Sequence, residues 1–165
     1  MANMTPGQAV VETLKAEGVR YIFGVVGSSY LDILDALYAR EDIRFIGVRH
    51  EQGASLMADG YARASGRPGA CIATSGPGAT NLVTGVAAAF LGYSPVIAMA
   101  PSPDRVNLLR DAVQELDLVS IFRPITKLSI QVNSSQRVPE LMRHAIRTAT
   151  SGRPGPVFVD IPRDL

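Results

Sequence analysis

Residues 50–81 read HEQGASLMADGYARASGRPGACIATSGPGATN, and this stretch decides the expected fold. It begins where an apolar segment at residues 43–48 ends, so that Glu51 follows a predicted strand and opens a predicted helix. A second apolar segment at residues 69–74 then leads into a glycine-rich turn, Ser75 to Gly78. Two strand-to-helix turns therefore follow one another. In open parallel sheets such turns lie at the edge where ligands bind.

The rest of the chain continues this alternation. Strands are expected at residues 21–26, 43–48, 69–74, 95–100, 125–132 and 156–161. Helices are expected at about 6–17, 30–37, 51–64, 79–91, 113–120 and 136–150. Thr5 to Gln8 forms a capping box for the first helix, and Ser29 with Asp32 is expected to cap the second. We predict an α/β fold: a doubly wound, mainly parallel sheet of about six strands with helices on both faces, in a single domain spanning residues 1–165.

Composition excludes several function classes. The 165 residues are 47% hydrophobic, and sixteen basic against fifteen acidic residues give a net charge of +1. Without a basic stripe, nucleic-acid binding is not expected. The apolar region at residues 83–100 is interrupted by glycine, serine and proline, so no membrane span is expected. Cys71 is a lone cysteine in a predicted strand, and no signal peptide is recognisable. We expect a cytoplasmic protein.

Glu51 is the first candidate for chemistry. A carboxylate at a strand end, beside Val48 and Ala54, should be partly shielded from water, which would let it share a proton with a ring nitrogen. The alternative is a purely structural acid that complements the dipole of its helix.

The turn Ser75–Gly78 is the second candidate. Its glycines allow close approach of a ligand to the backbone. It lacks the third glycine of the dinucleotide fingerprint, because Asn81 stands there, and it lacks the P-loop lysine. A flat ring fits the turn better than a pyrophosphate, and the alternative is a turn that merely lets helix and strand pack closely. No metal site is expected, because His50 and His144 are not in a cluster with ligand spacing.

Residues 49–85, RHEQGASLMADGYARASGRPGACIATSGPGATNLVTG, resemble the N-terminal pyrimidine-binding domain of thiamine-diphosphate enzymes in the acetolactate-synthase-like group. The resemblance extends to FGVVGSS at 23–29, AVQELD at 112–117 and GPVFVDIPRDL at 155–165.

The resemblance implies a role for each matching residue. Glu51 matches the glutamate that bonds N1′ of the cofactor's aminopyrimidine, and so promotes the imino form that removes a proton from the thiazolium ring. Residues near the pyrimidine ring would be Val25, Val26, Gly27, Thr74, Gly78 and Asn81. Ser28 and Gln114 would approach the substrate, a small 2-oxoacid or aldehyde.

The resemblance also implies what lies elsewhere. In this family a second domain with a Gly-Asp-Gly signature holds the diphosphate and Mg²⁺, and this sequence has no Gly-Asp-Gly. The chain should therefore need a diphosphate-binding domain or subunit, should be inactive alone, and should form a dimer or tetramer. FAD is possible, as in some relatives, but not indicated.

Three alternatives stay open. Two features look closer to the sulfoacetaldehyde acetyltransferase and benzaldehyde-lyase-like members of this family. They are the sequence GVVGS at residues 24–28, and Ser102 at a position where acetolactate-forming relatives often have a glutamine. Outside enzymes of this family, a non-catalytic nucleotide-binding domain or an assembly domain would also suit a doubly wound sheet.

Overall fold

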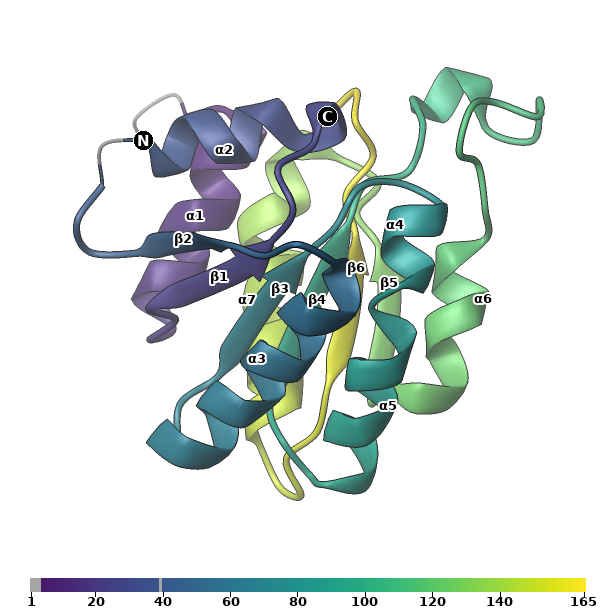
Figure 1. The fold of residues 1–165 in the computed structure, drawn as a ribbon. Helices are drawn as coiled ribbons and strands as arrows, with labels where there is room; N and C mark the ends of the chain where they lie inside the picture. The colour runs from purple at the N-terminus through teal and green to yellow at the C-terminus, as the bar shows by residue number, and fades with distance from the viewer. Residues whose placement is uncertain (1–3, 39) are drawn as a thin grey trace.

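A computed structural model describes residues 4–38 and 40–165 (Figure 1). Within them, six strands form one sheet in the order β2-β1-β3-β4-β6-β5, and every neighbouring pair is parallel. The strands are β1 (Tyr21–Gly24), β2 (Arg44–Gly47), β3 (Gly69–Ile72), β4 (Val96–Ala100), β5 (Leu128–Gln131) and β6 (Val157–Asp160). The predicted α/β fold class is confirmed.

Helices cover both faces of the sheet (Figure 1). On one face lie α1 (Pro6–Ala16), α2 (Leu31–Leu37) and α7 (Val138–Thr150). On the other lie α3 (Glu51–Ser65), α4 (Pro77–Thr80), α5 (Val83–Leu91) and α6 (Leu118–Phe122). None of the helices among the described residues combines the length and apolar character that crossing a bilayer requires.

Each face has its own hydrophobic core, because successive strand residues point to opposite sides of the sheet. In β3, Ile72 packs with the α1 and α7 side, whereas Cys71 packs with the α3 and α5 side. The second core is built largely of alanines, so its helices approach closely. In this core the Phe122 ring stacks on that of Phe158, with ring centroids 4.0 Å apart.

The strand order places a topological switch point at β1. The chain runs from β1 to its neighbour β2, and then crosses to β3 on the other side of β1. A crevice forms at the carboxyl ends of strands where the winding direction reverses. Strands β1, β2 and β3 all end beside this crevice. The segments that follow them there are Val25–Gly27, Val48–Glu51 and Ala73–Gly78.

Several predicted boundaries were wrong. The helix expected at 79–91 is interrupted at Asn81–Leu82, between α4 and α5. The helix expected at 113–120 begins only at Leu118, because Gln114 has a left-handed backbone with φ 62°. Residues 101–117 form a long loop that contains a 3₁₀ turn at Arg105–Asn107.

The predicted cap of the second helix was also wrong. Asp32 turns away from its own helix and accepts a 2.6 Å hydrogen bond from the backbone N–H of Gly7 in α1. The Thr5 hydroxyl donates to the same carboxylate at 3.0 Å. Ser29 makes no capping bond, and its buried hydroxyl has no partner among the described residues. The capping box of α1 itself is confirmed.

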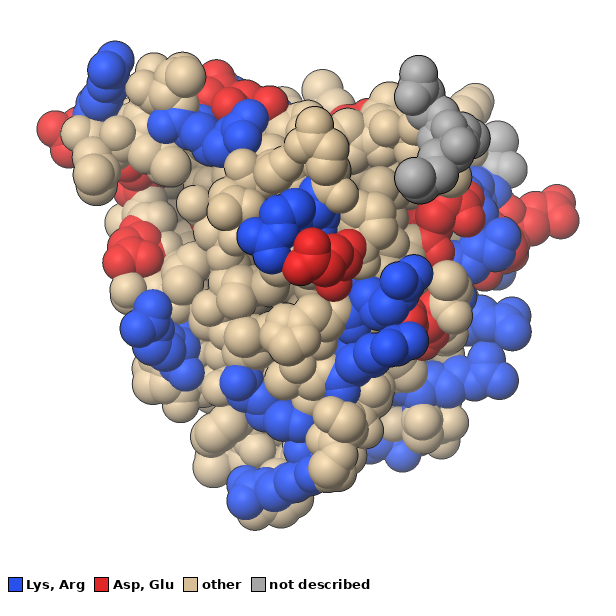
Figure 2. Space-filling view, turned by 180° about the vertical axis from the view of Figure 1, so that it is seen from behind, with Lys and Arg blue, Asp and Glu red and all other residues tan. Residues whose placement is uncertain are grey.

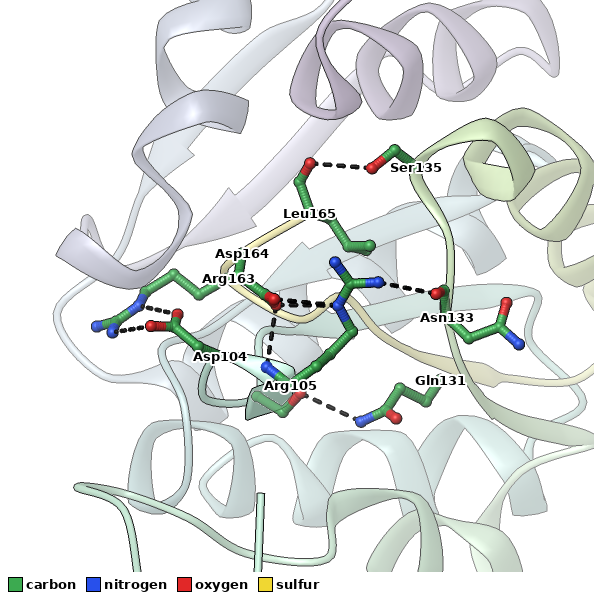
Figure 3. Close-up of polar contacts among 9 residues, drawn as sticks. Asp104, Arg105, Gln131, Asn133, Ser135, Arg163, Asp164 and Leu165 are labelled. Atoms are coloured by element: carbon green, nitrogen blue, oxygen red, sulfur yellow. Dashed lines mark hydrogen bonds and ion pairs between the residues drawn. The ribbon is translucent and has the colours of Figure 1, made fainter. Parts of the chain in front are cut away.

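Two ion pairs hold the last residues of the chain. Arg163 pairs with Asp104 at 3.0 Å, and Arg105 pairs with Asp164 at 3.1 Å (Figure 3). Arg105 also donates to the Asn133 carbonyl oxygen at 2.9 Å. These contacts join the segments that follow β4, β5 and β6.

The surface charge is dispersed. Seen from behind, basic side chains lie in small groups separated by uncharged surface, with acidic side chains among several of them (Figure 2). Glu17, which follows α1, pairs with both Arg143 and Arg147 of α7. Such exposed pairs add little stability.

Candidate cofactor site

Glu51 is the first residue of α3, and the residue before it sets its position. His50 has an extended backbone and caps the helix, because its Nδ1 atom accepts a 3.1 Å hydrogen bond from the Gln52 N–H. The segment before it continues the sheet, since the Val48 N–H donates to the Gly24 carbonyl oxygen at 2.9 Å. Glu51 is therefore fixed at the switch point, and its carboxylate is half-buried.

The second polar group of the site is Asn81. Its side-chain amide donates a 3.0 Å hydrogen bond to Oε2 of Glu51. The break between α4 and α5 places Asn81 at the end of α4, where its side chain can reach the start of α3. No hydrogen bond to the other oxygen, Oε1, occurs within the described residues, so Oε1 is free to bind a ligand.

Thr74 links the turns after β1 and β3. A Cβ at Gly27 would overlap the methyl group of Thr74, and a Cβ at Gly78 would overlap its hydroxyl. A Cβ at Gly78 would also lie 3.3 Å from Oε1 of Glu51. Both glycines are needed because Thr74 fills the space between them. Thr74 thereby sets the distance between the two turns.

The predicted residues after β1 border the same place. Val26 is 67% exposed, which leaves an apolar surface at the switch point. The Val25 carbonyl oxygen accepts a hydrogen bond from the Tyr30 hydroxyl. Burial raises the pKa of Tyr30, and the nearby negative charge of Glu51 raises this pKa further.

Sequence reasoning missed Tyr30. Its ring is buried, lies 3.4 Å from the position of a Cβ at Gly27, and fixes the turn that carries Val25 and Val26. An aromatic residue directly after a glycine-serine turn was the available signal. Because its hydroxyl stays protonated, Tyr30 serves as a donor to the backbone and not as a base.

The two predicted substrate residues are not drawn into this cluster. Ser28 is exposed at the start of a 3₁₀ turn. The Gln114 side chain is also exposed, and only its main chain approaches the site, because a Cβ at Gly76 would lie 2.5 Å from the Gln114 carbonyl oxygen. Gly76 also has φ 55°, so both this close contact and its left-handed backbone favour glycine at the position.

The geometry fits one half of a cofactor such as thiamine diphosphate. A half-buried carboxylate with a free oxygen, next to exposed apolar surface and glycine backbone, suits a flat ring that carries a nitrogen. It does not suit a diphosphate with a metal ion, because among residues 4–38 and 40–165 no three His, Cys, Asp or Glu side chains converge as a metal site requires.

Comparison with known proteins agrees with this geometry. Residues 4–121 match the family model of the thiamine pyrophosphate enzymes, N-terminal TPP binding domain. The chain is 48% identical over 162 residues to a probable acetolactate synthase large subunit of Methanocaldococcus jannaschii, which covers 98% of the chain and 27% of that protein. It is 47% identical over 166 residues to an acetolactate synthase of Arthrospira platensis, which covers 99% of the chain and 29% of that protein.

A third relative is the acetolactate synthase isozyme 2 large subunit of Escherichia coli K12, 46% identical over 162 residues, with 98% of the chain and 29% of that protein covered. The chain thus spans between a quarter and a third of the length of these relatives. Since the family model covers most of the chain and the identities are high, the chain belongs to the thiamine pyrophosphate enzymes, as an N-terminal TPP-binding domain of the acetolactate-synthase-like group.

Proposed function

We propose that this domain binds the aminopyrimidine ring of thiamine diphosphate and that Glu51 activates the cofactor for 2-oxoacid decarboxylation and carboligation. The observation that carries the proposal is the convergence of Glu51, Asn81 and Gly78 at the switch point, with Oε1 of Glu51 free. Bound thiamine diphosphate supplies a nucleophilic carbon and an electron sink. The chain's own residues orient its ring and hold a proton beside it.

In this proposal each residue has a defined task. Glu51 shares a proton with the ring nitrogen N1′ through Oε1, while Asn81 holds Oε2 and so fixes the plane of the carboxylate. Val25, Val26 and Gly27 contact the ring from the turn after β1. Thr74 and Gly78 support it from the turn after β3, and Ser28 and Gln114 approach the substrate.

The remaining parts of the site would come from elsewhere. We propose that residues 1–165 act as one pyrimidine-binding domain, and that a diphosphate-binding domain or subunit supplies the diphosphate and Mg²⁺ ligands. The much greater length of the relatives supports this. The domain alone would then be inactive, and the assembled enzyme would be a dimer or tetramer. The acetolactate synthases among the relatives favour pyruvate over sulfoacetaldehyde or benzaldehyde-type substrates.

The test compares this chain with its Glu51→Gln variant, each assembled with the diphosphate-binding region. Pyruvate-dependent CO₂ release and cofactor affinity are measured with thiamine diphosphate and Mg²⁺. Glutamine keeps the shape but cannot hold the proton, so kcat should fall by about 10²- to 10⁴-fold. Glu41→Gln, at an exposed position, is the matched control.

Equal turnover in Glu51→Gln and the parent would remove Glu51 from the chemistry. Absence of CO₂ release in every variant, with saturable cofactor binding retained, would keep the cofactor role and reject pyruvate. Sulfoacetaldehyde would then be the next substrate to assay.

A further inference from the structure

The loop of residues 101–117 connects β4 to α6 and touches the cofactor site at one place. A Cβ at Gly76 would lie 2.5 Å from the Gln114 carbonyl oxygen, so the main chain of the loop rests on the turn that follows β3. The same turn carries Gly78, which lies beside Glu51. The position of the loop therefore affects the geometry of the site.

The loop is held in a conformation that its own residues do not favour. Leu109, Asp111 and Gln114 have left-handed backbones, with φ between 53° and 64°, which non-glycine residues rarely adopt. Leu109 is 98% exposed, so packing of its side chain does not compensate for the strain. Backbone strain persists only where surrounding contacts over-determine the conformation. The loop therefore depends on contacts made by its other groups.

One set of contacts lies within the loop. The Glu115 carboxylate accepts hydrogen bonds from the backbone N–H groups of Leu109 and Ala112, the second at 2.9 Å. These bonds close residues 109–115 into one unit. They determine the shape of this part of the loop, but not its position relative to the sheet.

The segment that follows β6 supplies the second set, at the base of the loop. The Arg163 N–H donates to the Ser102 carbonyl oxygen at 3.1 Å, and its guanidinium makes two hydrogen bonds to the Asp104 carboxylate, at 3.0 and 3.2 Å. The next pair has the opposite polarity: the backbone N–H and the Nε of Arg105 both donate to Asp164, each at 3.1 Å (Figure 3). We call Asp104–Arg163 and Arg105–Asp164 the crossed pairs.

The crossed pairs differ from ordinary surface ion pairs. Isolated exposed pairs contribute little, whereas two-point arginine–carboxylate contacts and charge networks are the exceptions. The side chains of Asp104 and Asp164 are only 28% and 25% exposed, and Arg105 also donates to the Asn133 carbonyl oxygen at 2.9 Å. The guanidinium of Arg163 lowers the pKa of Asp104, which keeps this acid charged. The base of the loop is therefore fixed to the segments after β5 and β6.

We propose that the crossed pairs position the substrate-side loop for the reaction. They hold residues 102–105 so that the unit closed by Glu115 places Gln114 against Gly76. This inference rests on the proposed function, in which Gln114 approaches the substrate. The four charged residues are positioning residues, because they act through the loop and are not drawn into the cofactor site.

The test uses Arg163→Asp, which sets an acid against Asp104, in the enzyme assembled with the diphosphate-binding region. The KM for pyruvate should rise about tenfold, because a hydrogen bond to a charged substrate is lost when Gln114 moves. The affinity for thiamine diphosphate should stay at that of the parent, because Glu51 and Asn81 are unchanged. Amide hydrogen exchange of residues 106–117, followed by mass spectrometry, should become faster.

The double variant Asp104→Arg/Arg163→Asp restores the ion pair with reversed polarity, so it should recover both the KM and the slow exchange. Arg137→Asp is the matched control, because it breaks an exposed ion pair with Glu140 beside the start of α7. It should change neither quantity. A general loss of stability would lower the amount of active enzyme without raising KM, and a second charge reversal would not repair it.

If Arg163→Asp does not fold, Asp164→Asn breaks the other crossed pair with a smaller change and should shift both quantities in the same direction. Unchanged exchange, faster exchange without a rise in KM, or a double variant that recovers neither quantity would overturn the proposal. Exchange needs no turnover. If the parent does not use pyruvate, the proposed substrate fails, and the exchange of the single and double variants alone decides whether the crossed pairs hold the loop.

Discussion

The side-chain amide of Asn81 and the carboxylate of Glu51, thirty residues apart in sequence, are joined by a 3.0 Å hydrogen bond at the switch point of the sheet. The bond fixes one carboxylate oxygen and leaves the other available. A carboxylate that can rotate would present the free oxygen to a ring nitrogen only part of the time. The orientation of Glu51 therefore depends on Asn81.

Asn81→Ala should lower turnover of the assembled enzyme roughly tenfold, because a hydrogen bond to a charged group is worth about 1.5–3 kcal/mol and both partners are half-exposed. Asn81→Asp should lower turnover further, because it places a second negative charge beside Glu51. Thr80→Ala is the control, because it also removes one hydrogen bond, to the Pro77 carbonyl oxygen, from the same turn. A loss in Thr80→Ala equal to that in Asn81→Ala would show that the Glu51 contact has no specific role.

Gly27→Ala should destabilise the domain by about 1–3 kcal/mol, because its Cβ overlaps the methyl group of Thr74. Thr74→Ser removes that methyl, so the double variant should recover most of the loss. The same serine should not rescue Gly78→Ala, which overlaps the Thr74 hydroxyl. Urea unfolding of the single and double variants gives the coupling energy between Thr74→Ser and each of the two glycine substitutions.

The control for these variants is Gly60→Ala in α3, where a Cβ meets nothing within 4 Å. It should stabilise the domain by about 0.5–1 kcal/mol, as alanine does in helix interiors. Equal coupling of Thr74→Ser to both glycine variants would refute the assignment of one overlap to the methyl and the other to the hydroxyl.

Asp160 should make stability depend on pH. Burial raises its pKa from 3.8 to about 6, while hydrogen bonds from Gln131 and Ser102 lower it partway. Folding therefore favours the protonated form of Asp160. The stabilisation that results is complete below pH 3.8, the ordinary pKa of the group, and is lost as the pH rises through about 6, its pKa in the folded state.

Asp160→Asn removes that titration. It should raise the free energy of unfolding at neutral pH by up to about 3 kcal/mol, which corresponds to the shift of roughly two pKa units. The gain should disappear in acid, and urea titrations on both sides of about pH 6 measure it. A gain that is the same in acid and at neutral pH would mean that the Asp160 carboxyl is not the titrating group.

Cys71 should be inert to alkylation in the folded domain. Its side chain is fully buried in β3, and burial raises the pKa of its thiol to about 12, so almost no thiolate forms at neutral pH. The rate of iodoacetamide labelling should rise only in urea, in parallel with loss of helical circular dichroism. Rapid labelling without denaturant would indicate local opening of the central sheet.

Most of the fold could be predicted because the signals that specify its elements depend on only a few neighbouring residues. The Thr5 capping box, the apolar strand around Cys71 and the start of α3 at Glu51 all depend on neighbours in the chain. The same signals placed Glu51, Thr74 and Gly78 at one edge of the sheet, and the structure brings them together.

The errors arose where contacts distant in sequence decide the structure. Asp32 binds the start of α1 because that helix lies beside it, which no local pattern encodes. Residues 113–117 have a helical composition, but the Glu115 carboxylate binds the loop backbone at Leu109 and Ala112 instead. The burial of the Asp160 carboxyl was equally invisible, because its sequence signal is only an acid at the end of an apolar strand.

The strand order also affects how the chain can fold during its synthesis. The last strand, β6, lies between β4 and β5, so β5 has no partner in the sheet until residues 157–160 have left the ribosome. Until then the Phe122 ring of α6 lacks Phe158, on which it stacks. The nascent chain must therefore keep the edge of β4 and one face of α6 exposed to the end of translation of this domain, which makes that interval the one most open to misassembly and chaperone binding.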